Sequence, residues 1–204
     1  MAETTEKWTE FPARMFDRAT VVCPSCLQRF KQAEDHCERC GFDAYKTVKS
    51  FPFKPPVMER FMDHAGVLDE RLVYDLNDAA DKFSVRFPQV GLYFCTIEMD
   101  DPVSLSEFGF WMMNACQLQE GQKEEDRAWS ILLLIDVRRG ILSLTPGYAI
   151  EAFIEDSSWE NALQLISPDL ATGDYRAALS KYVKHAEALL RDSAERVKKK
   201  VRSQ

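Results

Sequence analysis

Length, composition and charge place the chain among ordinary globular proteins. Of its 204 residues, 46% are hydrophobic and 29% are charged, as in most soluble domains. The longest apolar run, from Ile131 to Ile135, is far shorter than the roughly 20 residues that a membrane-spanning helix needs. The N-terminal sequence MAETTEKWTEFPARMF has early acids and no apolar segment, so it lacks the features of a secretory signal. We therefore expect a cytoplasmic protein without a membrane span.

The net charge of −7 is unevenly distributed along the chain. Residues 1–58 carry nine Lys or Arg against eight Asp or Glu, residues 59–190 carry 11 against 23, and residues 191–204 carry six against two. The long central part therefore has a net charge of −12, which repels the phosphate backbone of nucleic acids. Nucleic-acid binding is not expected for that part and stays open only for the segments that flank it.

Four cysteines follow an N-terminal arm (residues 1–20) and dominate residues 21–48. They have the spacing C-x2-C-x10-C-x2-C, in which each C-x2-C pair can direct two thiolates at one ion. Gly41 allows the turn that follows the second pair, and Pro24 stiffens the first. A segment this short buries too little apolar surface to fold alone, so the metal would supply the folding energy. The sequence thus predicts a structural zinc ribbon with the ligands Cys23, Cys26, Cys37 and Cys40.

Other interpretations of these cysteines are weaker. A C-x2-C redox pair would need a thioredoxin-like βαβ context, which is absent around Cys23. His36 adjoins Cys37, but four thiolates already complete the coordination shell. Cys23 and Arg29 have the spacing of a cysteine phosphatase, without its glycine-rich anion loop. A closed four-thiolate site leaves no position for a reacting water, so we expect the zinc to be structural and not catalytic.

The remaining chain alternates between helical and strand patterns. A proline-rich segment, residues 49–58, is predicted to be a stiff linker. Residues 59–190 follow with a helix capped by Asp69, a strand over 89–99, a helix opened by the Ser104–Glu107 capping box, the strand WSILLLID, a turn and the strand ILSLT, and two more helices. This order, αβαββαα, predicts an α/β three-layer sandwich on a short mixed sheet. A basic helical tail is expected over 191–204.

Several stretches of residues 58–190 resemble the TPM domain family. The stretches are DHAGVLDE (63–70), SILLLIDVRRGILSLTPGYAIE (130–151) and SPDLATGDYRAAL (167–179), together with a short apolar helix containing FW. The family includes thylakoid-lumen proteins linked to photosystem II repair and phosphatase activity, a nematode receptor modulator and many bacterial proteins without a known role. The resemblance implies an α/β domain and, for some members, phosphatase activity. The chain departs from the family motif G-Y-G-x-E at Ala149.

No catalytic constellation is evident, but four carboxylates lie near the ends of predicted elements. They are Asp63, Asp136, Glu151 and Asp156. Some TPM-like domains are thought to bind a divalent cation near such acids, and ligands of open α/β sheets gather at strand ends. Oxygen ligands suit Ca²⁺ or Mg²⁺, with weak affinity expected. Each acid also has a purely structural interpretation, as a helix cap or a turn residue.

The leading hypothesis is a non-catalytic binding or adaptor protein with a structural zinc ribbon, whose partner is another protein. One alternative is a divalent-metal-dependent phosphatase of the TPM type that uses acids such as Asp63 and Asp136. A second alternative is contact with nucleic acid through the ribbon. The sequence does not indicate an oligomeric state.

Overall fold

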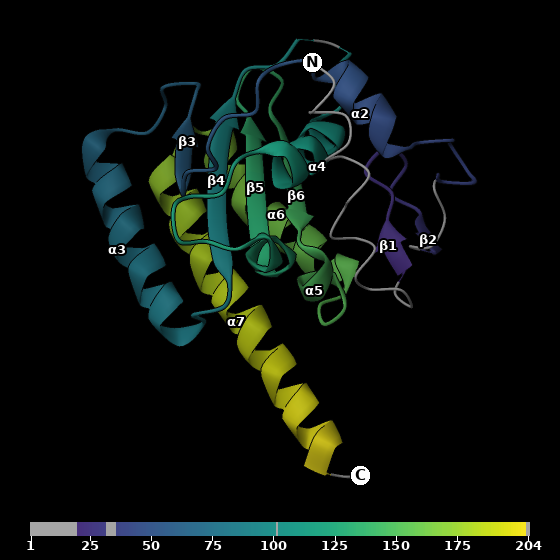
Figure 1. Cartoon of the computed structure of the whole chain (residues 1–204). Coiled ribbons are helices and arrows are strands. Elements are labelled where there is room, and N and C mark those ends of the chain that lie inside the picture. The colour runs from purple at the N-terminus through teal and green to yellow at the C-terminus, as the bar shows by residue number, and fades with distance from the viewer. Residues whose placement is uncertain (1–19, 32–35, 101, 203–204) are drawn as a thin grey trace.

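The computed structural model describes residues 20–31, 36–100 and 102–202 (Figure 1). Its centre is a four-stranded mixed sheet with the order β3-β4-β5-β6. These strands span Phe61–Asp63, Gly91–Ile97, Ser130–Asp136 and Ile141–Pro146. The first three are parallel, and β6 runs antiparallel to β5 after a tight turn. Every residue of β5 is buried, whereas no residue of β6 is, so β5 is the central strand and β6 an edge strand.

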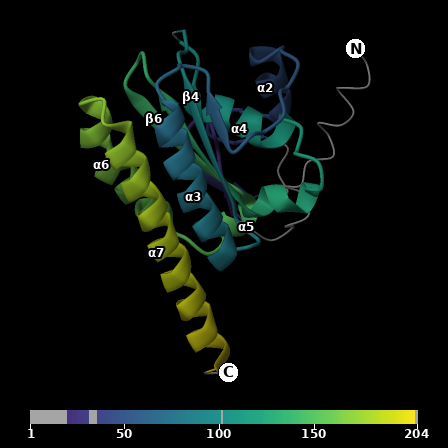
Figure 2. The same cartoon turned by 90° about the vertical axis from the view of Figure 1, so that its left-hand side faces the viewer.

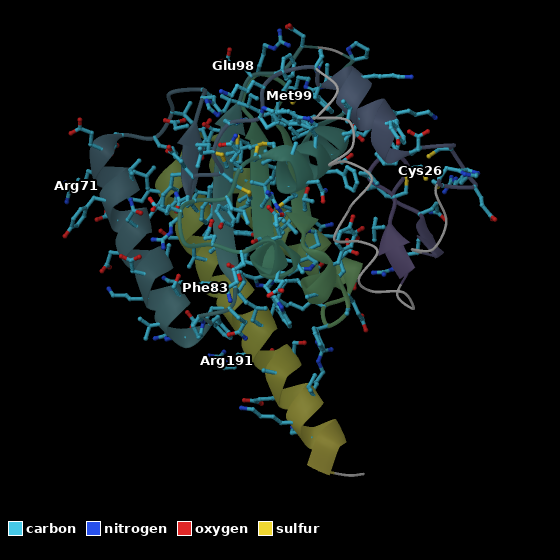
Figure 3. The ribbon with its side chains drawn as sticks, viewed as in Figure 1. Cys26, Arg71, Phe83, Glu98, Met99 and Arg191 are labelled. Atoms are coloured by element: carbon cyan, nitrogen blue, oxygen red, sulfur yellow. The ribbon has the colours of Figure 1, made fainter. Side chains whose placement is uncertain are left out.

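Helices cover the two faces of the sheet and make three layers, as the sequence predicts (Figures 1 and 2). One face is covered by α3 (Glu70–Arg86), α6 (Asp156–Ala171) and α7 (Tyr175–Arg202). Phe83 of α3 is buried against this face, next to α7 (Figure 3). The opposite face is covered by α4 (Leu105–Ala115). The alternation of side chains along each strand supplies both cores.

The N-terminal part forms a small hairpin beside the sheet. Strands β1 (Thr20–Val22) and β2 (Arg29–Lys31) pair in antiparallel fashion. A short helix, α2 (Ala44–Ser50), follows and is capped by the side chain of Asp43, which accepts from the N–H of Lys46 at 2.9 Å. This helix was not predicted, because its seven residues are too few for a clear periodic pattern.

Caps predicted from the sequence open two helices. The Asp69 side chain accepts from Leu72 N at 2.7 Å, and the Ser104 hydroxyl accepts from Glu107 N at 3.3 Å. Ser157 and Glu160 also have the spacing of a capping box, from which a helix starting at residue 158 is predicted. Helix α6 instead begins at Asp156, with Glu155 at its N-cap and no side-chain cap.

Strand β3 is the main element that was not predicted from the sequence. Its three residues, Phe61–Asp63, pair with Phe94, Cys95 and Thr96 of β4. A strand this short has too few residues for a periodic signal. The chain order of the domain is therefore βαβαββ followed by helices. The proline-rich segment ahead of β3 is also anchored, because Phe51 and Met58 are buried in the core under α4.

The C-terminal helix α7 extends well beyond the sheet (Figures 1 and 2). Arg191 lies where this helix leaves the body of the molecule (Figure 3). In the described part of the chain, no helix combines the length and the apolar character needed to cross a membrane.

Candidate metal centre and adjoining groove

The four cysteine sulfurs converge on one point. The Sγ atoms of Cys23 and Cys40 are 3.6 Å apart and those of Cys26 and Cys37 are 3.7 Å apart, and all four sulfurs lie within 4.8 Å of one another. A tetrahedral zinc with bonds of ~2.3 Å requires neighbouring sulfurs about 3.8 Å apart. The donor set and its spacing therefore fit zinc, and the described residues contain no other cluster of three or more possible metal ligands.

The two C-x2-C segments have the same backbone conformation. In the first, Cys23 N donates to Gln28 O and Leu27 N donates to Cys23 O. The second repeats this pattern, with Cys37 N donating to Phe42 O and Gly41 N to Cys37 O. Backbone N–H groups also face the sulfur of Cys37 and lower the pKa of its thiol to about 7. Each of these two turns places two cysteine sulfurs at the cluster, and the segment can do so without a large hydrophobic core.

Leu27 occupies a backbone conformation that suits glycine. Its φ angle is 59°. The matching residue in the second C-x2-C turn, or knuckle, is Gly41 with a φ angle of 67°. A left-handed conformation costs a residue with a Cβ roughly 1–2 kcal/mol. The Leu27 side chain is also 64% exposed, so its burial in the ribbon does not offset this cost.

The ribbon is seated on helix α4. Phe42 meets Phe110 of α4 edge to face with ring centroids 5.5 Å apart, and the Ser106 hydroxyl donates to the carbonyl oxygen of Pro24 at 2.5 Å. The other side of α4 approaches the sheet closely at Gly109, where a Cβ would lie 2.4 Å from the Thr145 hydroxyl. Helix α4 thus connects the metal centre to strand β6.

A groove of about 550 Å³ lies between the ribbon and the sheet and follows β6 along its whole length. Its walls come from the ribbon, α4, the start of α5 (Tyr148–Glu151) and α6. Apolar side chains dominate these walls, and they include Val22, Leu27, Leu105, Phe110, Met113 and Leu163. Figure 3 shows Cys26 in the N-terminal hairpin, on the side of the molecule opposite to Arg71 of α3.

The GY motif forms one end of this groove. A Cβ on Gly147 would lie 2.3 Å from the carbonyl oxygen of Arg127, so only glycine allows this close approach. Burial raises the pKa of Tyr148 above its ordinary value, and the negative charge of Glu151 adds to the effect. Trp159 of α6 lines the same end, is 5% exposed, and its indole N–H has no hydrogen-bond partner among the described residues.

Arg127 fixes the end of α4 and was not singled out in the sequence. It lies in the 3-10 helix η2 (Glu124–Trp129), in a strongly charged stretch of the sequence, and is only 7% exposed. Its guanidinium donates to the carbonyl oxygens of Met113 and Cys116 at 3.0 and 2.6 Å and pairs with Glu124 at 2.6 Å. A cation at the carbonyl end of a helix is electrostatically favourable. Arg127 follows four charged residues in the sequence, a pattern that is typical of an exposed segment, so its buried role was not predicted.

Asp63 closes the turn that follows β3. Its carboxylate accepts from Val67 N at 3.1 Å, from Leu68 N at 2.9 Å and from the hydroxyl of Thr96. Burial alone would raise the pKa of this carboxyl, but these hydrogen bonds outweigh it and hold the pKa below its ordinary value. The predicted turn role of Asp63 is therefore present in the structure.

Asp136 ends β5 with its side chain fully buried. It accepts from the backbone N–H of Arg139 at 3.1 Å and from the Arg139 guanidinium at 2.5 Å. Burial alone would raise the pKa of this carboxyl, but the bonds and charge of Arg139 outweigh it and lower the pKa. Arg139 also donates to the carbonyl oxygen of Val103, which ties the turn to the start of α4.

The four acids do not gather around one point. Asp63 is paired with Thr96 and Asp136 with Ile97, the next residue of β4. Because successive side chains of a strand face opposite sides of the sheet, the two carboxylates point to opposite faces. Glu151 lies at the groove, and the side chain of Asp156 lies outside the described residues. A weak Ca²⁺ or Mg²⁺ site at these acids stays a prediction that this geometry does not support.

The buried Asp136–Arg139 pair predicts a particular pH dependence of stability. A carboxyl whose pKa is lowered by folding stabilises the protein above its unfolded pKa of about 3.9, and this contribution is lost as the pH falls through the lower folded value. Asp136→Asn should lower the free energy of unfolding at pH 7 by about 3 kcal/mol and flatten its decline below pH ~4. Urea unfolding from pH 7 to pH 3 measures both. The exposed ion-pair acid Asp100 is the control, and an Asp136→Asn profile parallel to that of Asp100→Asn would contradict the prediction.

Zinc content is the second measurement. We expect about one zinc ion per chain in protein purified without chelator, because four thiolates complete a tetrahedral shell. Cys37→Ser should lose the metal and the ribbon structure while residues 59–190 remain folded. Cys116→Ala, which removes a buried thiol outside the cluster, should keep the metal. Elemental analysis measures the metal content, and circular dichroism measures the folding. A wild-type protein whose ribbon is folded without bound metal would contradict the prediction.

Comparison with known proteins agrees with the sequence resemblance. No protein of curated function matches the chain. The N-terminal domain of a protein from P. gingivalis, solved by NMR, shares 17% sequence identity and superposes with a TM-score of 0.51, covering 73% of this chain and 90% of that domain. This similarity supports the fold alone. The family pattern described as the TPM domain matches residues 61–189, which is more than half of the sequence, so the chain belongs to the TPM domain family.

Proposed function

We propose that this protein is a non-catalytic binding protein, in which a zinc ribbon and a TPM domain together form one ligand groove. The observation that carries the proposal is the groove along β6, because the ribbon and the domain each supply part of its wall. Its volume of about 550 Å³ falls in the range of roughly 300–1,000 Å³ that is usual for ligand sites. The ribbon then has a function beyond its own folding.

The charged groups support binding more than catalysis. Asp63 and Asp136 are each engaged by hydrogen-bond donors of the protein and face opposite sides of the sheet. General acid–base or metal-assisted hydrolysis needs such groups to meet at one reacting atom. The phosphatase alternative would require these acids to rearrange, whereas binding in the groove requires no change in them.

Two measurements on the full chain test the proposal together. In protein NMR spectra, small apolar fragments such as indole should perturb the amide signals of Leu27, Leu142 and Leu144 and leave those of Asp63 and its turn unchanged. Phosphate release from p-nitrophenyl phosphate with Mg²⁺ or Ca²⁺ should stay at the level of the protein-free blank. Phosphate release that Asp136→Asn or Asp63→Asn abolishes would establish the phosphatase alternative. If the fragments do not perturb the amide signals of the groove residues, the binding proposal is contradicted.

A further inference from the structure

Strand β6 has an unpaired backbone edge that faces the groove. Gly147 N donates to Ser130 O, and hydrogen-bonded pairs alternate with non-bonded pairs along an antiparallel ladder. With the observed register, Thr145 and Ser143 bond to β5, whereas the N–H and C=O groups of Leu142 and Leu144 point away from it. No described strand pairs with this outer edge.

Pro146 fits this arrangement. It is the next outward-pointing position after Leu144, where its missing N–H removes no bond to β5. The edge therefore presents two N–H donors, from Leu142 and Leu144, and the three carbonyl oxygens of Leu142, Leu144 and Pro146. An extended polypeptide is the ligand that matches such a row of alternating donors and acceptors.

We propose that the groove binds an extended, cationic peptide segment of a partner protein, which adds as a strand to the outer edge of β6. This inference rests on the proposed function and specifies the ligand of the same groove. Apolar side chains of the peptide would pack on Leu27, Phe110 and Met113, which line the groove. Trp159, whose indole N–H is buried without a hydrogen-bond partner among the described residues, also lines the groove.

The charges around the groove determine which sign of charge the bound peptide should carry. Both arginines that line the groove are held by carboxylates of the protein, Arg127 by Glu124 and Arg139 by Asp136. Glu160 lines the α6 end of the groove, and residues 59–190 carry a net charge of −12. A cationic segment is attracted to this surface and an acidic one is repelled.

Leu27 supplies the most specific test residue. It keeps an exposed leucine in a left-handed conformation at the groove wall, where the equivalent residue of the other knuckle is Gly41. Leu27→Gly relieves the backbone conformation and leaves all four cysteines in place. If Leu27 has only a structural role, this substitution keeps or raises stability without other effect. If it contacts a peptide, the substitution weakens binding.

The experiment measures fluorescence anisotropy of a labelled hexapeptide of alternating valine and lysine with the full zinc-loaded chain. We expect saturable binding that becomes at least about tenfold weaker when the peptide is N-methylated at the residues facing β6, because backbone pairing is lost while the charge is unchanged. A valine–glutamate peptide should not bind. Leu27→Gly should weaken binding about threefold or more at an unchanged or higher melting temperature.

The outcomes separate this inference from the proposed function. Equal affinity of the methylated and unmethylated lysine peptides would overturn strand addition and leave only charge attraction to the acidic domain. Apolar fragments that perturb the groove while no peptide binds would overturn the peptide but keep the binding function. Binding seen only after deletion of residues 1–19 would assign the groove to the chain's own N-terminal segment and overturn the partner peptide. Failure of both fragments and peptides would overturn both proposals.

Discussion

The convergence of four thiols within 4.8 Å of one another is the constraint on which the ribbon, and the groove that it borders, depend. Thiolates this close repel one another unless a cation lies between them. In the described part of the hairpin, only Cys23, Cys37 and Phe42 form a buried apolar centre. Such a core cannot offset the conformational entropy of the segment. We therefore propose that a bound metal determines whether the ribbon folds.

Helix α4 carries that constraint into the TPM domain. Its Phe110 holds the ribbon, its Gly109 lies directly on Thr145 of β6, and Arg127 holds its C-terminal carbonyl groups. Because these contacts all involve the same helix, the ribbon and the edge strand have a fixed relation to one another. The groove between them is thus a consequence of packing that already serves stability. The two cores of the sheet consist mainly of residues from the strands and from α3, α4, α6 and α7, and the ribbon supplies one wall of the groove.

Much of the fold could be predicted from the sequence, because its signals are local. The four-cysteine spacing, the apolar strand of β5 and the caps at Asp69 and Ser104 each depend on a few neighbouring residues. The features that were missed depend on contacts distant in sequence. Strand β3 is defined by its pairing with β4, and the role of Arg127 is defined by carbonyl groups of α4. The cation site at Asp63 and Asp136 stays a prediction, and the strand register that places their side chains on opposite faces of the sheet is not visible in local sequence. Leu27 had a possible signal in its position four residues after Cys23, where Gly41 follows Cys37, but sequence alone did not show that its side chain borders a groove.

Hydrogen exchange measured by mass spectrometry, with and without a zinc chelator, tests most directly whether the metal holds the ribbon on α4. The amides of Cys23, Leu27, Cys37 and Gly41 are hydrogen-bonded within the two knuckles, so residues 20–31 and 36–42 should exchange slowly with zinc and rapidly without it. The N-terminal turn of α4 should lose part of its protection, because Ser106 and Phe110 contact the ribbon. Strands β4 and β5 should remain protected throughout. Knuckle amides that stay protected after complete removal of zinc would show that the ribbon folds without metal and would contradict this account.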